Sequence, residues 1–281
     1  MRTECPSFSK VNIGLKILDK RNDGYHNINT IFQELEFGDY VTIDEIANGC
    51  EVLSNVTWIP SNKNNICYKA YYELSKKFPN LNGVRITIKK NVPVGSGLGG
   101  GSANAAAALK GICKLFDLKL SENELESIGV KIGADVPFFI RGGVQFGEGI
   151  GEKLTKIKNP IPGFYLLVMP NIKINTNWAY SQFKNQLNSD KSLTKFPRFL
   201  VQDFSSPKFF ENDFERIVIP AYPEIGKIKK KILNFGASFA SLSGSGSTVY
   251  GIFNDEAFAK DAELFFRNSH NTILSKPKQY F

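Results

Sequence analysis

Hydrophobic and polar residues alternate in several short runs of the chain, as they do in β-strands that bury one face. Val84, Ile86 and Ile88 alternate with polar residues, and residues 8–17 follow the same pattern. We expect further strands at residues 40–46, 50–56 and 164–169, of which the last is continuously apolar. The chain is therefore expected to have a substantial β component.

Helices are predicted for Pro-free segments that are rich in good helix formers, such as residues 105–116. They are also predicted after residues that can cap a helix N-terminus. Asn65 precedes one such segment, and Thr176 precedes another. Ser121 and Glu124 have the spacing of a capping box, which predicts a further helix.

Proline and glycine mark where some of these elements end. Asp135 lies where a predicted helix ends, and Pro137 comes two residues later. We expect Pro137 to prevent the helix from continuing and residues 138–140 to begin an apolar strand. Repeated glycines in residues 142–154 predict a hairpin or a bulged strand pair. Residues 184–207 are polar and irregular, which predicts a loop.

The length of 281 residues suits one large or two medium-sized domains, with enough apolar residues for real cores. The basic, proline-containing stretch 155–162 divides the chain, so we predict domains at residues 1–155 and 156–281. The sequence has no run of about eighteen apolar residues, so we do not expect a membrane span. The first residues have neither the apolar region nor the cleavage site of a signal peptide.

The formal net charge of +8 bears on which ligands the protein could bind. The positive residues are dispersed, and the densest runs, at 227–231 and 153–158, are most simply solvated surfaces. No stripe of basic and aromatic residues resembles a nucleic-acid module. An excess of positive charge would instead steer polyphosphate substrates. Four scattered cysteines without a CxxC pair predict free thiols in a reducing cytoplasm.

The segment NVPVGSGLGGGSANAAAA, at residues 91–108, lies between a predicted strand and a predicted helix. It contains five glycines and two serines. Glycine has no Cβ, so backbone N–H groups can converge on a polyanion, and the N-terminus of the following helix adds the positive end of its dipole. We therefore interpret this segment as a phosphate-binding loop.

Three other interpretations of this loop are weaker. A Walker P-loop requires Lys after the glycines, and none follows here. Gly95, Gly97 and Gly100 satisfy the GxGxxG spacing of dinucleotide-binding motifs. However, Asp117, which would have to end a second strand, ends a predicted helix. A flexible linker is disfavoured because Leu98 and the alanine run are typical of ordered structure.

Several polar residues lie where a buried environment is expected, and each has a structural and a functional interpretation. Lys10 and Asn12 share one face of their strand, so they either have polar partners in the interior or face solvent on an edge strand. Asp135 leads into an apolar segment, either as a buried cap or as a catalytic carboxylate. The turn at residues 244–247 is either a linker or part of a site. The residues alone leave these alternatives open.

The loop sequence PVGSGLGGGSANAA resembles the nucleotide-binding motif of the GHMP kinases, which include galactokinase, homoserine kinase and mevalonate kinase. Other segments match family motifs, in the expected order along nearly the whole chain: KVN at 10–12, GADVPFF at 133–139 and SGSGS at 243–247. The sequence DGYH at residues 23–26 is similar to that of the group that acts on 4-diphosphocytidyl-2-C-methyl-D-erythritol.

The resemblance implies a two-domain α+β fold of the GHMP kinase type. The N-terminal ATP-binding domain, residues 1–155, would be similar to domain 2 of ribosomal protein S5. The C-terminal GHMP kinase domain, residues 156–281, would be a ferredoxin-like α/β sandwich. The active site would lie in the cleft between the two domains.

The resemblance also implies the parts of a phosphoryl-transfer site. Asp135 would be the catalytic base, and Lys10 beside it would keep Asp135 ionised and offset the growing negative charge. The ATP phosphates would be bound by the residues of the loop: Pro93, Val94, Gly95, Ser96, Gly97, Leu98, Gly99, Gly100, Gly101, Ser102 and Ala103. No Asp or Glu stands out as a dedicated metal ligand, so Mg²⁺ would arrive bound to ATP, with Ser102 as a metal contact.

Binding of the phosphate acceptor is implied for a further set of residues: Asn12, Tyr25, His26 and Thr176. Tyr25 and His26 would hold the cytosine by ring stacking and hydrogen bonding. Gly244 and Ser245 would line the site. The sequence NDFE at residues 212–215 also has a family counterpart, although a helix-start box explains it equally well.

The expected reaction is phosphorylation of the 2-hydroxyl of 4-diphosphocytidyl-2-C-methyl-D-erythritol by ATP, in the non-mevalonate route to isoprenoid precursors. The nearest alternative is another GHMP kinase that acts on homoserine or on a mevalonate derivative, and DGYH argues against it. A more distant alternative is a non-catalytic basic binding protein, for example for RNA. The presence of Lys10, Asp135 and the glycine loop disfavours that alternative.

Overall fold

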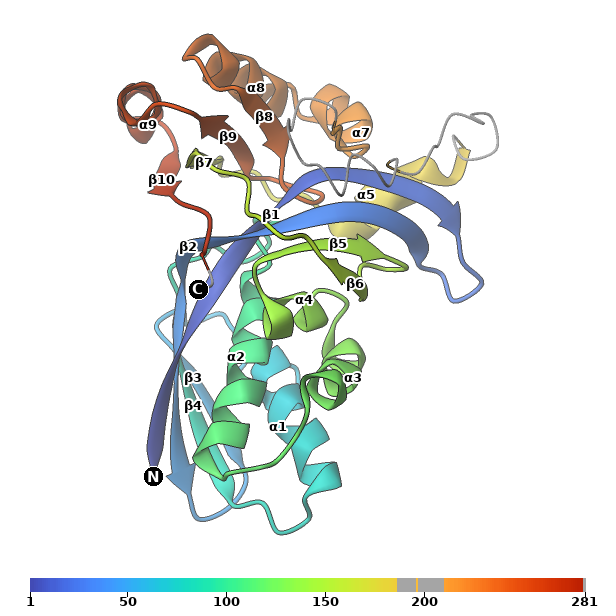
Figure 1. Cartoon of the computed structure of the whole chain (residues 1–281), viewed down its shortest axis with the longest axis vertical. Coiled ribbons are helices and arrows are strands. Elements are labelled where there is room, and N and C mark those ends of the chain that lie inside the picture. Colours follow the sequence, from blue (N-terminus) through green and yellow to red (C-terminus); the bar gives the residue numbers. More distant parts are fainter. Residues whose placement is uncertain (186–195, 197–209, 280–281) are drawn as a thin grey trace. The chain divides into compact units, whose positions relative to one another are not determined.

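The computed structural model describes residues 1–185, 196 and 210–279 (Figure 1). The chain divides into two compact units that interleave along the sequence. The first unit comprises Met1–Ser9, Gly38–Val94 and Gly99–Gly142, and the second comprises Lys10–Phe37, Gly95–Leu98 and Gly143–Phe281. The glycine loop therefore contributes residues to both units.

The described residues form both strands and helices. The strands are β1 (Arg2–Lys20), β2 (His26–Ile46), β3 (Cys50–Ser54), β4 (Gly83–Lys89), β5 (Val144–Glu148), β6 (Lys153–Lys156), β7 (Phe164–Met169), β8 (Phe239–Leu242), β9 (Val249–Phe253) and β10 (Asn271–Ser275). The helices are α1 (Ile66–Lys77), α2 (Gly100–Leu115), α3 (Glu122–Ile132), α4 (Val136–Arg141), α5 (Thr176–Ser181), the 3₁₀ helix η1 (Gln182–Asn185), α7 (Glu215–Ala221), α8 (Pro223–Asn234) and α9 (Glu256–Arg267).

In the first unit, β4 pairs in antiparallel fashion with β2 and in parallel fashion with β3. Val41 lies opposite Ile88 and Ile43 lies opposite Ile86, and all four side chains are buried. Helices α1 and α2 pack against these strands (Figure 1). Helix α2 approaches them closely because it consists largely of small residues. A Cβ added to Gly111 would lie only 2.4 Å from Ile43 Cδ1.

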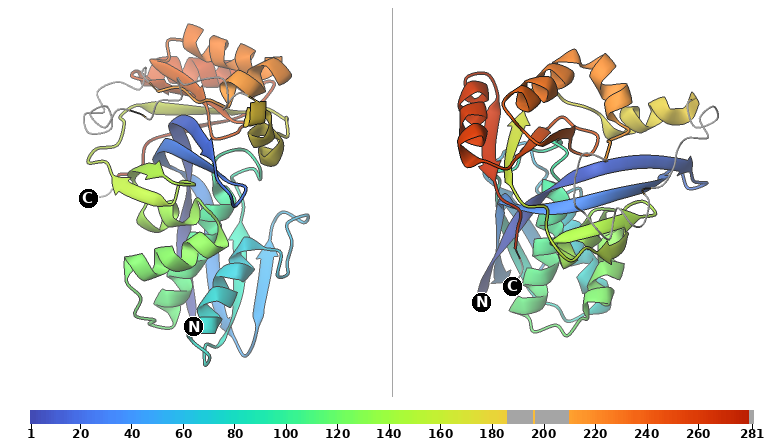
Figure 2. Two further views of the ribbon diagram at one scale, coloured as in Figure 1. Left: turned by 90° about the vertical axis from the view of Figure 1, so that its right-hand side faces the viewer. Right: turned by 45° about the horizontal axis from the view of Figure 1, so that its top comes forward.

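The second unit contains a four-stranded antiparallel sheet in the order β10-β7-β9-β8. Helices α8 and α9 cover one face of this sheet (Figure 2). Ile225, Ile228 and Ile232 recur at helical spacing on α8 and are buried in the core there. On the opposite face the rings of Tyr165 and Tyr250 stack with centroids 6.3 Å apart. Apart from α5 and α7, the succession β7-α8-β8-β9-α9-β10 is the ferredoxin-like arrangement predicted for the C-terminal half.

Many of the predicted elements are confirmed. Asn65 caps α1, because its side chain accepts a hydrogen bond of 2.8 Å from Cys67 N. Ser121 and Glu124 form both bonds of a capping box at the start of α3. The glycine-rich residues 142–154 include β5 and the start of β6, which form an antiparallel pair as predicted.

Two local predictions are wrong. Residues 138–140 lie in helix α4 and not in a strand. Pro137 lies in the first turn of α4, where a missing backbone N–H removes no helical hydrogen bond, so proline begins this helix instead of stopping it. The N-cap of α5 is Asn175 and not Thr176, since the Asn175 side chain accepts a hydrogen bond of 3.0 Å from Trp178 N.

Two further predictions are not tested by this architecture. The loop predicted at residues 184–207 falls almost entirely outside the described residues. The domain boundary between residues 155 and 156 also stays a prediction, because the compact units follow the packing and interleave along the chain. Among the helices that the structure describes, none is long and apolar enough to cross a membrane.

Candidate active site

The N-terminus of α2 is the first structural feature that suits a phosphate group. Gly99 precedes the helix with φ +71°, a left-handed conformation that favours glycine, and no side chain caps the helix there. A Cβ added to Gly101 would meet no atom within 4 Å, so the backbone in this first turn is open to a ligand. Uncapped N–H groups and the positive end of the helix dipole together favour an anion.

A buried polar network in the first unit anchors the chain that leads into the glycine loop. Asp39 Oδ1 accepts hydrogen bonds from Asn91 N (2.7 Å) and Val92 N (2.8 Å). Its other oxygen, Oδ2, binds Lys90 Nζ and accepts a 2.8 Å bond from Asn104 Nδ2. Lys90 Nζ also donates to Asn104 Oδ1 at 3.0 Å. The carboxylate is only 1% exposed, so the charge pair lies in the interior with its polar atoms bonded.

Residues 95–98 of the loop belong to the second unit, where they contact the turn that joins β8 to β9. Ser243 Oγ donates to Gly97 O at 2.9 Å, and Thr248 N donates to Ser96 O at 3.1 Å. Gly97 has φ +83°, and a Cβ there would lie 2.1 Å from Ser243 O. Only glycine allows this close approach of the two backbones.

Lys10 and Asn12 lie in the interior of the second unit and not on a solvated edge. They are 4% and 2% exposed, and Lys10 Nζ donates a 2.6 Å hydrogen bond to Asn12 Oδ1. Asn12 Nδ2 donates to Thr30 Oγ1 at 2.9 Å, and Tyr250 Oη donates to Asn12 O at 2.8 Å. Lys10 N donates to Leu98 O at 3.0 Å, which ties this strand to the glycine loop. Burying an ammonium group is costly, and this arrangement compensates for part of the cost.

The turn at residues 244–247, called the second glycine turn, also lies close to Lys10 and Asn12. A Cβ on Gly244, which has φ +57°, would lie 3.4 Å from Asn12 Oδ1 and 3.6 Å from Lys10 Nζ. The hydroxyl groups of Ser245 and Thr176 are hydrogen-bonded to each other at 3.0 Å. The structure therefore brings Lys10, Asn12, Gly244 and part of the glycine loop together, and the turn is an integral part of the fold and not a linker.

His26 and Tyr25 have different environments. His26 is buried, and its ring stacks on Tyr180 with centroids 5.2 Å apart and an interplanar angle of 16°. Burial lowers the pKa of His26 below its ordinary value of 6.5, which favours the neutral imidazole. His26 Nε2 is buried without a hydrogen-bond partner in the structure. Tyr25 is 59% exposed, so its ring is available for stacking on a ligand.

Asp135 belongs to the first unit, where it directly precedes α4. Its side chain makes no capping hydrogen bond to that helix and is only partly buried, which argues against a buried cap. Two residues earlier, a Cβ on Gly133 would lie 3.8 Å from Ser102 Oγ, so this segment lies beside the start of α2. The predicted pairing of Asp135 with Lys10 stays a prediction, because Lys10 belongs to the other unit.

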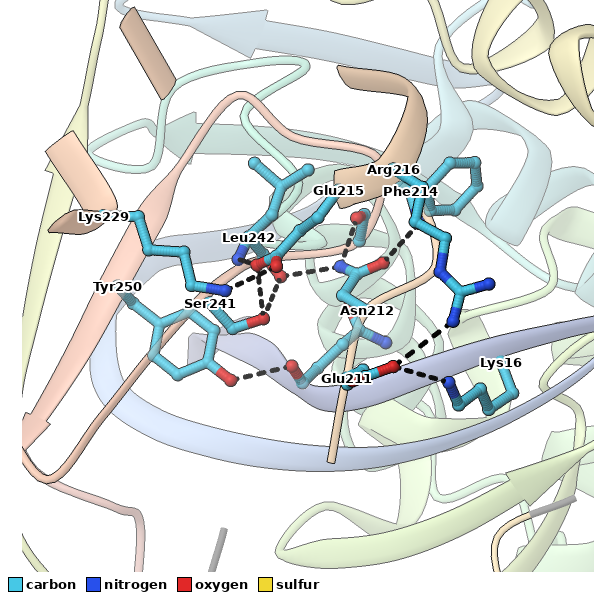
Figure 3. Close-up of polar contacts among 12 residues, drawn as sticks. Lys16, Glu211, Asn212, Phe214, Glu215, Arg216, Lys229, Ser241, Leu242 and Tyr250 are labelled. Atoms are coloured by element: carbon cyan, nitrogen blue, oxygen red, sulfur yellow. Dashed lines mark hydrogen bonds and ion pairs between the residues drawn. The ribbon is translucent and has the colours of Figure 1, made fainter. Parts of the chain in front are cut away.

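Sequence reasoning missed several of the residues that shape these segments. Asp39 and Lys90 are far apart in sequence, and no local pattern links them, because Asp39 lies within β2 and Lys90 directly follows β4. Asn212 was recognised only as part of a motif with two interpretations. Its amide in fact binds the second glycine turn, as Figure 3 shows.

No preformed metal cage is found among residues 1–185, 196 and 210–279, where no three His, Cys, Asp or Glu side chains are grouped to hold an ion. The open N-terminus of α2 fits a polyphosphate, which itself supplies oxygen ligands to a divalent cation. The donor set is therefore compatible with a metal ion that enters together with a nucleotide.

Comparisons with known proteins give a consistent result. The family model described as GHMP kinases N terminal domain matches residues 65–143, and the model described as GHMP kinases C terminal matches residues 202–271. The 4-diphosphocytidyl-2-C-methyl-D-erythritol kinase of Acetivibrio thermocellus is 39% identical over 264 residues, which cover 93% of each chain. The protein of the same name from Geotalea daltonii is 39% identical over 268 residues and 95% of each chain.

A solved structure agrees with these matches. A crystal structure of 4-(cytidine 5'-diphospho)-2C-methyl-D-erythritol kinase has a TM-score of 0.84 to this chain at 25% sequence identity. The similarity covers 99% of this chain and 100% of the other. The predicted fold, a mixed helix-and-sheet architecture with N- and C-terminal GHMP domains, is thereby confirmed.

Proposed function

The chain belongs to the GHMP kinases, in the family of 4-diphosphocytidyl-2-C-methyl-D-erythritol kinases, and on this premise we propose the reaction that it catalyses. The protein transfers the γ-phosphoryl group of ATP to the 2-hydroxyl of 4-diphosphocytidyl-2-C-methyl-D-erythritol, giving the 2-phosphate and ADP. The step would belong to the non-mevalonate route to isoprenoid precursors, in the cytoplasm. The observation that carries the proposal is the buried Lys10–Asn12 pair beside two glycine-rich segments.

The glycine loop binds the phosphates of ATP in this proposal. The open first turn of α2 supplies backbone N–H groups to the anion, and Gly101, where an added Cβ would meet no atom within 4 Å, allows its close approach. The ATP-binding role extends over residues 93–103. Ser102 Oγ would contact a Mg²⁺ ion that arrives bound to ATP, and this ion would supply electrostatic stabilisation of the phosphate charge.

Catalysis requires positioning and charge stabilisation more than covalent chemistry by the protein. Asp135 accepts the proton from the 2-hydroxyl, so the acceptor oxygen can attack the γ-phosphorus as the bond to the ADP oxygen breaks. The Lys10 ammonium offsets the negative charge that develops on the transferred group. Its hydrogen bond to Asn12 orients this ammonium.

The cytidyl group of the acceptor is recognised by Tyr25 and His26. The exposed Tyr25 ring suits stacking, which does not require a particular hydrogen-bonding pattern. The unpartnered Nε2 of His26 suits a hydrogen bond to the base, and the lowered pKa favours the neutral ring. Asn12 and Thr176 contact the rest of the acceptor, and Gly244 and Ser245 line the site.

A substrate panel tests this proposal. Purified protein is supplied with Mg-ATP and, in separate reactions, with the cytidyl alcohol, homoserine or mevalonate, and ADP formation is followed. We expect turnover with the cytidyl alcohol alone, and phosphorus NMR of the product should show a phosphomonoester on the 2-oxygen. Turnover with homoserine or mevalonate instead would retain the kinase chemistry and refute the acceptor. Binding of ATP by folded protein without turnover of any of the three would also refute the acceptor.

A further inference from the structure

The residues around Asn212 form a dense set of polar contacts that the proposed chemistry does not use (Figure 3). Asn212 and Glu215 belong to the NDFE segment, which the sequence alone could explain as a helix-start box. The structure contradicts that explanation for Glu215, because its carboxylate accepts bonds from Ser241 Oγ (3.0 Å) and Leu242 N (2.9 Å). Both donors lie at the end of β8, and neither belongs to the N-terminus of α7.

Asn212 spans the beginning of the second glycine turn with one amide group. Asn212 Nδ2 donates to Leu242 O at 2.7 Å and to Gly244 O at 2.8 Å. Its Oδ1 accepts a 3.0 Å bond from Phe214 N, which fixes the orientation of the amide. The side chain is buried, with the residue 2% exposed, so these bonds have little competition from water. A primary amide is suited to this task because it carries two N–H donors on one nitrogen.

The backbone on either side of Asn212 is tied to β1, the strand that carries Lys10 and Asn12. Leu15 N donates to Glu211 O, and Asp213 N donates to Leu15 O, each at 2.8 Å. Asp213 Oδ2 also accepts a 2.9 Å bond from Ile17 N. Asn212 is therefore held opposite Leu15 of β1, which lies three residues after Asn12 in the sequence.

These contacts close a ring within the second unit. The ring runs along β1 from Asn12 to Leu15, across to Asn212, through its amide to Gly244, and back to Asn12 and Lys10. The last step is short, because a Cβ on Gly244 would lie 3.4 Å from Asn12 Oδ1 and 3.6 Å from Lys10 Nζ. Any displacement of Gly244 O from Asn212 therefore changes the space beside the Lys10 ammonium.

We propose that Asn212 is a positioning residue for phosphoryl transfer, which holds the second glycine turn against Lys10 and Asn12. This inference rests on the proposed function, because it assigns Lys10 a role in the reaction. Asn212 itself touches neither substrate nor the reacting atoms. Its amide fixes Gly244, and Gly244 limits where the Lys10 ammonium and the Asn12 side chain can lie.

The test compares Asn212→Ala with Ser241→Ala in the full-length protein. Asn212→Ala removes its hydrogen bonds to Leu242 O and Gly244 O. Ser241→Ala removes the hydrogen bond from Ser241 Oγ, in β8, to Glu215 and leaves both Asn212 bonds intact. Urea unfolding gives the folded fraction of each variant, and kcat is calculated per folded molecule. We expect kcat of Asn212→Ala to fall by about 10-fold to 10²-fold, with the KM for ATP changed less than about threefold. Ser241→Ala should retain the wild-type kcat.

Each alternative outcome is decisive. An unchanged kcat in folded Asn212→Ala, with lower stability only, would mean that Asn212 has a purely structural role and would overturn the proposal. A change confined to the KM for ATP would overturn it as well, because the turn would then act on the nucleotide alone. If Asn212→Ala does not fold, Gly244→Ala decides, since its Cβ would come into contact with Asn12 Oδ1 and Lys10 Nζ and would strain the turn at φ +57° while Asn212 stays in place. A lowered kcat in that variant supports the proposal, and an unchanged kcat refutes it.

A second readout separates this inference from the proposed reaction. In protein labelled with [¹⁵N]asparagine, Asn212→Ala should shift the side-chain NH₂ resonances of Asn12, which Asn212 does not contact, and Ser241→Ala should leave them in place. Unshifted resonances would refute the ring of contacts even in an active enzyme. Shifted resonances in a protein that phosphorylates another acceptor would refute the proposed substrate and preserve the positioning role.

Discussion

The two glycine-rich segments of this protein are anchored by different kinds of polar group. In the first unit, the chain entering the glycine loop is held by the Asp39 carboxylate, whose charge is balanced by buried Lys90. In the second unit, the neutral amide of Asn212 donates to Leu242 O and Gly244 O at the beginning of the glycine turn. The charged group accepts bonds from backbone N–H groups, whereas the amide donates bonds to backbone carbonyl groups.

The difference follows from which backbone groups each segment leaves without a partner. A carboxylate can accept several hydrogen bonds at once, so it suits consecutive N–H groups such as those of Asn91 and Val92. Two carbonyl groups close together need donors, and an amide supplies them without introducing a charge. The two anchors should therefore respond differently to truncation, because removing one partner of a buried ion pair leaves a charge uncompensated.

The largest loss of stability is expected for Lys90→Met. This variant leaves Asp39 buried without its cation, and we expect the free energy of unfolding to fall by roughly 3–5 kcal/mol. Urea denaturation measures the change. The double variant Lys90→Met/Asp39→Asn is the control, because asparagine keeps an oxygen that can accept from Asn91 and Val92 without a charge. It should be more stable than Lys90→Met alone, and equal or lower stability would contradict the electrostatic explanation.

An intermediate loss is expected for Gly97→Ala, which affects the contact between the loop and the turn. Its Cβ would lie 2.1 Å from Ser243 O at a φ of +83°, so backbone strain and overpacking together should cost about 3 kcal/mol. Gly95→Ala is the matched control, with a φ of +75° and no atom within 4 Å of the added Cβ. We expect it to cost only about 1–2 kcal/mol in the same unfolding assay. Equal losses would show that the close backbone approach is not what requires glycine.

The smallest effect is expected for Lys229→Met in the second unit. Lys229 pairs with Glu215, but its side chain is 28% exposed, and Glu215 keeps its bonds to Ser241 and Leu242 in the variant. Partly exposed ion pairs typically contribute less than about 1 kcal/mol. Thermal and urea unfolding should therefore differ little from the wild type. A loss as large as that of Lys90→Met would show that burial of the ion pair does not determine the cost of removing its lysine.

Local patterns predicted most of the secondary structure because their causes lie within a few residues. The alternation in β4 and the capping box at Ser121 are such cases, and both are confirmed. The strand predicted at residues 138–140 is wrong because Pro137 is compatible with a helix start as well as with a helix end. The cap of α5 was misplaced by one residue because Asn175 and Thr176 are both good N-cap residues.

The anchors could not be predicted in this way because their partners are distant in sequence. Lys90 and Asp39 are separated by 51 residues, and Asn212 and Gly244 by 32. No periodicity connects such pairs, and the local explanation of NDFE as a helix start was equally consistent with the sequence. The burial of Lys10 and Asn12, in contrast, followed from the alternating strand together with the family resemblance, and the structure confirms that both are buried with polar partners.

In the proposed reaction, Asp135 accepts the proton of the acceptor hydroxyl during phosphoryl transfer. The most direct test is kcat of Asp135→Asn with the cytidyl alcohol and Mg-ATP, because the substitution keeps the shape of the side chain and removes its basicity. We predict that kcat falls by about 10²–10⁴-fold while ATP affinity and the unfolding free energy stay near wild-type values. A kcat within about threefold of the wild type would contradict the claim and remove Asp135 from the mechanism.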